Sequence, residues 1–75
     1  MPLQVHTTYD PVRGRWHNKI AGTGAVFGAA DQKTDAVAAG RAEALALGAE
    51  LLVHNEDGTI ARRERPGIQP ASGSA

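Results

Sequence analysis

The stretch from Leu51 to Ile60 constrains the fold of this chain more than any other. An apolar run, Leu51 to Val53, enters a polar turn that ends in Asp57-Gly58, and the β-branched residues Thr59-Ile60 follow it. Glycine adopts a positive φ without steric cost, and turns of this kind join neighbouring antiparallel strands. We therefore predict a β-hairpin here, with Gly58 in the left-handed region of backbone conformation.

Length limits the rest of the architecture. The chain has 75 residues and no cysteine. A domain of this size buries only a little over half of the surface that its unfolded chain exposes, so its stability is marginal. Without cysteine there are no disulfides and no thiolate chemistry, and a cytoplasmic location is the expectation. We find neither the basic and apolar regions of a secretory signal nor an apolar run long enough to span a membrane, and we expect no membrane association.

Alternation of apolar and polar side chains predicts strands at residues 3–8 and 15–20, with turn residues at 9–14 between them. The most economical arrangement is an antiparallel hairpin in which Thr8 lies opposite Arg15. That register would place His6 opposite His17. A short third strand, weakened by a glycine, is expected at residues 25–28.

After Asp31 the apolar period changes from two to that of a helix. Asp31 or Thr34 is the expected capping residue, and Gly48 suits the left-handed position at the other end. The apolar pattern that predicts the face packed on the sheet consists mainly of small residues and includes Ala36, Val37, Gly40, Ala44, Leu47 and Leu51. Leu45 falls nearly opposite this face and is expected to be exposed.

These elements together predict an α+β domain. We expect an antiparallel sheet of about five strands, in the order β-β-β-α-β-β along the chain, with one helix packed on one face. The single domain is expected to cover residues 1–66. Residues 67–75 are rich in proline, glycine and serine, and we predict that they are disordered.

The same order of elements resembles a small bacterial family known as domain of unknown function 2188. The resemblance is carried by Trp16 in the second strand, by a helix opening with Lys33 and Ala36, and by the closing block from Leu51 through His54 to Asp57-Gly58. It covers residues 3 to 67. Gln32 stands where the family's capping threonine is expected, and the turn at residues 9–14 is longer. The resemblance implies a fold and brings no activity with it.

Motifs for catalysis, cofactor binding and metal binding are missing from the sequence, and we predict no catalytic residue, no cofactor and no metal. Gly22-Thr23-Gly24 leads into a predicted strand, whereas a phosphate-binding glycine loop leads into a helix. Glu56 and Asp57 are expected to stabilise their turn. His6 and His17 would supply two metal ligands, fewer than a protein site needs. His54 is expected to form a hydrogen bond within its own hairpin.

Basic residues form the remaining candidate surface for phosphate or partner contact. They are Arg13, Arg15, Lys19, Arg62, Arg63 and Arg65. On a shared face they could contact several phosphates. However, eight basic and eight acidic residues give a formal net charge of zero, which argues against binding driven by a strong overall positive field. Arginine on a final strand also protects a sheet edge against aggregation, and we favour that role.

We therefore predict a non-catalytic interaction module, either self-associating or protein-binding, and not an enzyme. Few large apolar side chains are available for the core, so a homodimer is the expected state, with Leu45 as a candidate self-association residue. The alternative is a nucleic-acid-binding protein that uses the arginine-rich strand face. An enzyme with a site formed across a dimer is a third and weaker alternative.

Overall fold

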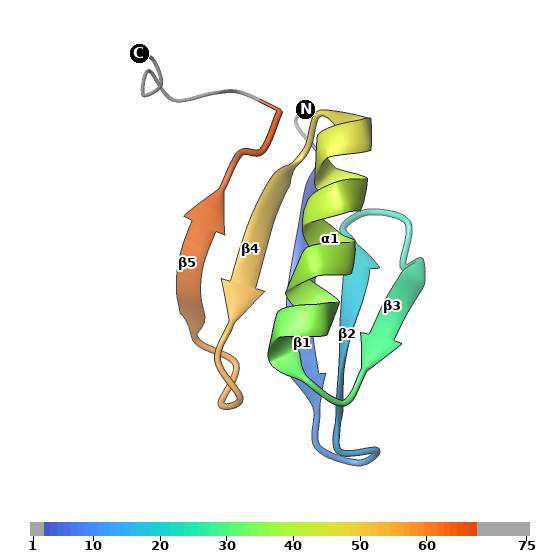
Figure 1. Ribbon diagram of the computed structural model, residues 1–75, viewed down its shortest axis with the longest axis vertical. Helices are drawn as coiled ribbons and strands as arrows, with labels where there is room; N and C mark the ends of the chain where they lie inside the picture. Colours follow the sequence, from blue (N-terminus) through green and yellow to red (C-terminus); the bar gives the residue numbers. More distant parts are fainter. Residues whose placement is uncertain (1–2, 68–75) are drawn as a thin grey trace.

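The computed structural model describes residues 3–67, which form one five-stranded sheet with one helix on one side of it (Figure 1). The elements in chain order are β1 (Gln4–Asp10), β2 (Arg15–Ile20), β3 (Val26–Ala30), α1 (Lys33–Leu47), β4 (Glu50–His54) and β5 (Ile60–Glu64). The predicted α+β class and the order β-β-β-α-β-β are confirmed. Of the predicted tail at 67–75, residues 68–75 lie outside the described residues.

The sheet is mixed, and the expectation of a purely antiparallel sheet was wrong in this respect. The strand order is β3-β2-β1-β4-β5, and β4 lies parallel to β1, while the other three pairs are antiparallel. A parallel pair needs a long crossover connection, and here the crossover from β1 to β4 contains α1. Leu51, Leu52 and Val53 are all buried because β4 is an inner strand between β1 and β5.

The hairpin of β1 and β2 has a different register from the predicted one. Asp10 pairs with Arg15, so Thr8 lies opposite His17 and His6 lies opposite Lys19. The reason is the tighter turn: the Asp10 carbonyl accepts the Gly14 N–H at 2.8 Å, and the Asp10 carboxylate accepts the backbone N–H of Val12 at 3.0 Å. This turn lets β1 continue two residues further than the sequence pattern indicated, to Asp10, whereas β2 has the predicted bounds.

Helix α1 begins and ends close to the predicted positions. Gln32 is the residue before the first turn and its side chain makes no capping hydrogen bond, so neither Asp31 nor Thr34 is the cap. Gly48 ends the helix at φ 66°, as predicted. The predicted inward residues are buried except Leu47, which is 38% exposed because it is the last helical residue before the chain turns back towards the sheet.

The core lies between α1 and the covered face of the sheet. Its main members are Val5, Val37, Ala44, Ala49, Leu51 and Val53. Trp16 of β2 is also buried, with 6% of its surface exposed. Opposite residues in paired strands share a face, so the registers place alternate residues of β1, β2 and β4 on the side away from α1. We call that side the helix-free face.

A buried polar pair connects the sheet to the helix. Thr7 and Asn18 are both fully buried, and the Thr7 hydroxyl donates to the Asn18 side-chain oxygen. The Asn18 amide group donates to the Ala36 carbonyl of α1 at 2.9 Å. Gly40 faces this pair, and a Cβ atom at that position would lie 2.3 Å from the Asn18 Oδ1 atom. The close approach of α1 to β2 therefore depends on glycine at position 40.

One strand remains outside the helix layer. Helix α1 packs on β1, β2, β3 and β4, and among the described residues it makes no comparable approach to β5. Figure 1 shows β5 at the side of the sheet, beyond β4. Gly58 in the turn before β5 has φ 93°, which confirms the predicted hairpin. The helix-side surface of β5 and its outer edge are therefore open.

Candidate functional site

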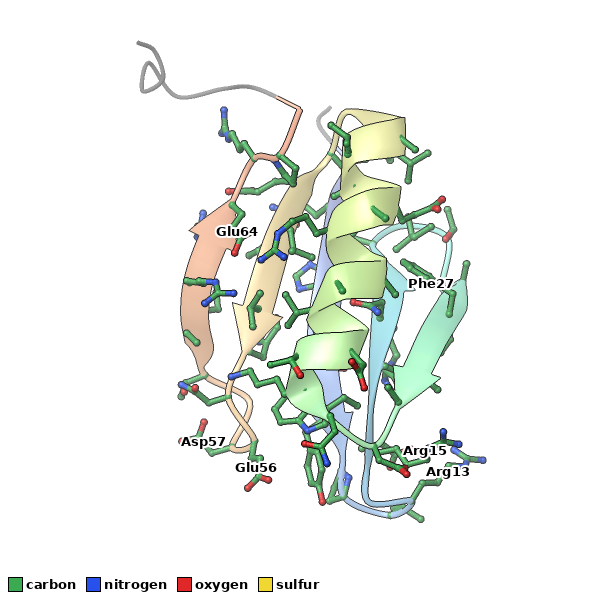
Figure 2. All side chains as sticks on the ribbon, in the orientation of Figure 1. Arg13, Arg15, Phe27, Glu56, Asp57 and Glu64 are labelled. Atoms are coloured by element: carbon green, nitrogen blue, oxygen red, sulfur yellow. The ribbon has the colours of Figure 1, made fainter. Side chains whose placement is uncertain are left out.

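The predicted basic residues do not form one surface. Arg15 and Lys19 lie on β2, whereas Arg62 and Arg63 lie on β5, with β1 and β4 between these strands. Figure 2 shows Arg13 and Arg15 beside the β1–β2 turn, far from Glu64 on β5. Neighbouring strands lie about 4.8 Å apart, so three strand spacings separate the two groups by about 14 Å.

On β5 itself, successive arginines face opposite sides of the sheet. Arg62 lies opposite Val53 on the helix side, and Arg63 lies opposite Leu52 on the helix-free face.

Several basic residues also have acidic neighbours: Arg13 with Asp10 at 3.3 Å, Arg15 with Asp31 at 3.2 Å, and Arg63 with Glu50 at 3.8 Å. Arg65 follows β5 and is exposed. These ion pairs are solvent-accessible, and each contributes little to stability.

Arg41, Glu64 and Arg62 form a cluster that bridges α1 and β5. The Arg41 guanidinium donates to both carboxylate oxygens of Glu64, at 2.8 and 3.0 Å, and the Arg62 Nε–H donates to the same carboxylate at 2.7 Å. The hydrogen bond from Arg41, followed by that from Arg62, holds the pKa of Glu64 below its ordinary value, against the opposing effect of burial. Both oxygens of the Glu64 carboxylate therefore accept hydrogen bonds from these two arginines.

A groove of about 280 Å³ lies beside this cluster, between α1 and β5. Lys33, Thr34, Val37, Arg41 and Arg62 line it. Three of these side chains are cations, and Glu64 is the one carboxylate paired with any of them among the described ion pairs. The groove therefore has a surplus of positive charge. We did not predict it from the sequence, although Lys33, Val37 and Arg41 recur at the four-residue spacing that puts side chains on one helix face.

His6 meets His54, and not His17, on the helix-free face. The two ring nitrogens, Nδ1 of His6 and Nε2 of His54, are 2.9 Å apart. The ring centroids are 5.2 Å apart and the planes differ by 28°, so the rings meet end to end. His54 Nδ1 lies 3.0 Å from the Gly58 carbonyl oxygen, which only accepts, so this nitrogen carries the proton. His6 Nδ1–H therefore donates to His54 Nε2, and the hairpin hydrogen bond predicted for His54 is present.

This pair is expected to make stability depend on pH. Burial, followed by the nearby His54, lowers the pKa of His6 below its ordinary value of 6.5, and Glu50 acts in the opposite direction. A lowered folded-state pKa means that the unfolded chain binds the proton more tightly. The free energy of unfolding should therefore decrease as the pH falls below about 6.5, and level off below the folded-state pKa.

Urea unfolding between pH 8 and pH 5 measures this dependence. His6→Gln should remove part of the slope near pH 6, whereas His17→Gln, on the same face but outside the pair, should keep it. An identical slope in both variants would show that the His6–His54 pair does not control the titration.

Three exposed leucines lie where α1 ends and β1 begins. Leu45 is 57% exposed, as predicted, Leu3 is 40% exposed and Leu47 is 38% exposed. Leu3 is held beside the start of β4 by the bond from the Glu50 N–H to its carbonyl, and Figure 1 shows that α1 ends at this same end of the molecule. We call these three residues the leucine end.

Within residues 3–67, no group of three or more histidine, aspartate or glutamate side chains is arranged to hold a metal ion. No helix in this part of the chain is long and apolar enough to cross a membrane.

Glu56 and Asp57 both lie in the exposed turn before β5 (Figure 2). Asp57 accepts hydrogen bonds from the Thr59 hydroxyl at 2.7 Å and from the Thr59 N–H at 2.9 Å, which stabilise that turn.

Comparison with known proteins identifies the family of the chain. The family model described as "Uncharacterized protein conserved in bacteria (DUF2188)" matches residues 5–65. The chain belongs to this family. The match includes α1 and all five strands apart from Gln4, the first residue of β1, and it confirms the family that the sequence resembles. No curated protein and no solved structure matches the DUF2188 chain.

Proposed function

We propose that this DUF2188 protein is a non-catalytic interaction module that associates with protein, and first of all with a second copy of itself. The observation that carries this proposal is the leucine end, where Leu3, Leu45 and Leu47 are all more than one-third exposed. Leu45 and Leu47 are two residues apart on α1 and point to different sides of the helix. Leu45 is the most exposed of the three at 57%, and large exposed apolar side chains are typical of protein-binding surfaces. A cytoplasmic location and the lack of a cofactor are part of the proposal.

A twofold dimer through the leucine end would supplement a small core. The core consists largely of alanine and valine, so little apolar area is buried per residue. Packing Leu45 against its counterpart in a second copy would remove further apolar surface from water. The dimer is then more resistant to unfolding than the monomer by mass action.

The melting temperature is therefore expected to rise with protein concentration. Thermal unfolding followed from low to high micromolar protein measures this dependence. Leu45→Lys should abolish it, because the new charge would have to be buried at the interface. Ala38→Lys makes a similar change at an exposed position in the first half of α1, and it should leave the concentration dependence intact. A melting temperature that stays constant in the wild-type protein would contradict self-association.

Nucleic-acid binding is the second candidate. It is favoured by the openness of the helix-free face, which carries Arg15, His17, Lys19 and Arg63. The wide separation of β2 from β5 and the acidic neighbours of Arg15 and Arg63 count against it. Titration with single-stranded and duplex DNA at two salt concentrations distinguishes the two functions, because binding through phosphates weakens steeply with salt.

A further inference from the structure

The open edge of β5 and the cationic groove beside it form a second surface, separate from the leucine end. We propose that this surface binds an extended acidic segment of a partner protein, which adds to the sheet as a sixth strand. The inference rests on the proposed function as an interaction module, and it adds the chemistry of the partner. Three observations carry it: a free strand edge, a local surplus of positive charge, and an arrangement of arginines that disfavours pairing with a second copy.

Both edges of the sheet contain one register shift, and in β5 it lies between Ile60 and Arg62. Strand β5 pairs with β4 on one side, and neither another strand nor α1 covers its other side within residues 3–67. From Arg62 to Glu64 its pairing with β4 is continuous. At the other edge, β3 contains Gly28 at φ 65° and its register with β2 shifts. The uncovered part of β5 from Arg62 to Glu64 therefore offers backbone N–H and C=O groups to an added strand.

Charge specifies what that strand should contain. Arg62 points to the helix side and Arg63 to the helix-free face. Glu50 lies 3.8 Å from Arg63, beyond hydrogen-bond distance, so the Arg63 guanidinium can still donate to a carboxylate of the added strand. Successive residues of an added strand also alternate between faces, so two adjacent acidic residues would lie next to Arg62 and Arg63 respectively. Lys33 and Arg41 extend the positive charge on the helix side, where Glu64 is already occupied. An extended segment with paired glutamate or aspartate therefore fits this edge.

The same arginines disfavour a second copy at this edge. Antiparallel pairing of β5 with itself about a twofold axis centres on one residue. Centring on Arg62 or Arg63 places two guanidinium groups directly opposite each other, which is destabilising. With Arg63 at the centre, Arg62 also lies opposite Glu64, but that carboxylate already accepts hydrogen bonds from Arg41 and Arg62 of its own chain. Centring on Ala61 avoids that contact but places Arg62 opposite Ile60, so the second copy adds no carboxylate beside Arg62. The β5 edge therefore favours an acidic partner, and self-association is left to the leucine end.

The experiment uses a capped, strand-forming peptide of about ten residues, a length that covers β5 with a margin at each end. It consists of alternating valine and threonine with two adjacent glutamates in the middle. Amide NMR spectra of the wild-type protein should show shifts in β5 and in the groove-lining residues of α1 as this peptide is added. Arg62→Gln and Arg63→Gln should each weaken binding about threefold or more. Arg13→Gln, beside the β1–β2 turn, should leave the affinity unchanged.

Two control peptides test the two parts of the proposal. Replacing the central glutamates with glutamines should weaken binding, and methylating alternate backbone nitrogens should abolish it. Equal binding of the glutamine peptide, or shifts confined to β2 and the helix-free face, would overturn the inference. Tighter binding of a single-stranded oligonucleotide to the same β5 amides would also overturn it. A protein whose melting temperature depends on concentration but that ignores the glutamate peptide would retain its proposed function and lose only this surface.

Discussion

Gly40→Ala is expected to destabilise the protein by about 2 kcal/mol or more, because overpacking a filled interior costs about 1 to 3 kcal/mol and here removes a buried polar contact. At an ordinary helix position the same change would stabilise by about 1 kcal/mol. The new Cβ would lie 2.3 Å from Asn18 Oδ1 and 3.1 Å from Leu51 Cδ1. The Asn18 side chain cannot move away from the new Cβ atom without losing a hydrogen bond, because it is hydrogen-bonded to Thr7 on one side and to Ala36 on the other.

Urea unfolding of Gly40→Ala measures the loss, and a double-mutant cycle identifies its cause. In an Asn18→Ala background the side chain that meets the new Cβ is gone, so the same substitution should cost much less. A Gly40→Ala protein that is more stable than the wild type would contradict the close packing of α1 on β2.

Trp16→Ala is expected to cost about 3 to 5 kcal/mol, the usual range for deleting a large buried aromatic side chain. Trp16 is 6% exposed, packs against the Tyr9 ring at a centroid distance of 5.1 Å, and lies under the Lys33 ammonium group at 5.1 Å. Because small domains have only about 5 kcal/mol or slightly more in total, the variant should retain about 2 kcal/mol or less, and up to about half of it should be unfolded at room temperature.

Circular dichroism of the Trp16→Ala protein detects this unfolding directly. Trp16→Phe keeps an aromatic ring in the site and should remain folded with a smaller loss of stability. If Trp16→Ala keeps the wild-type melting temperature, the tryptophan does not belong to the core, and a binding role for its ring gains support.

Local patterns in the sequence were sufficient to predict most of the elements. Alternation located β1 and β2, the helical period located α1, and Asp57-Gly58 located the last turn, since each of these depends on residues close in the chain. The register of the first hairpin was wrong because it depends on how Asp10 closes the turn. The alternation of apolar and polar residues gives no indication of the hydrogen bonds that Asp10 makes in this turn.

Strand neighbours were harder to predict than the strands themselves. The parallel pairing of β1 with β4 joins residues far apart in the sequence, and alternation within a strand does not say which strand lies beside it. One signal was available: Leu51, Leu52 and Val53 form an unbroken apolar run, which indicates a strand buried on both faces. An inner position in the sheet follows from that burial.

The candidate surfaces could also be predicted from the sequence only where they depend on residues close together in the chain. The exposure of Leu45 followed from its position on the helix, opposite the small residues that face the sheet. The groove between α1 and β5 could not be predicted from the sequence, because Arg41 and Glu64 come together only through the tertiary fold. The His6–His54 pair also depends on the pairing of β1 with β4, and so it could not be predicted from the hairpins alone.

The mass of the wild-type protein in solution tests the proposal of a self-associating module most directly. Light scattering at high micromolar concentration should give about twice the 7.8 kDa of the chain, decreasing towards the monomer value on dilution. Leu45→Lys should give the monomer mass throughout, and Ala38→Lys should behave like the wild type. A wild-type mass that stays at 7.8 kDa over the whole concentration range would contradict the account.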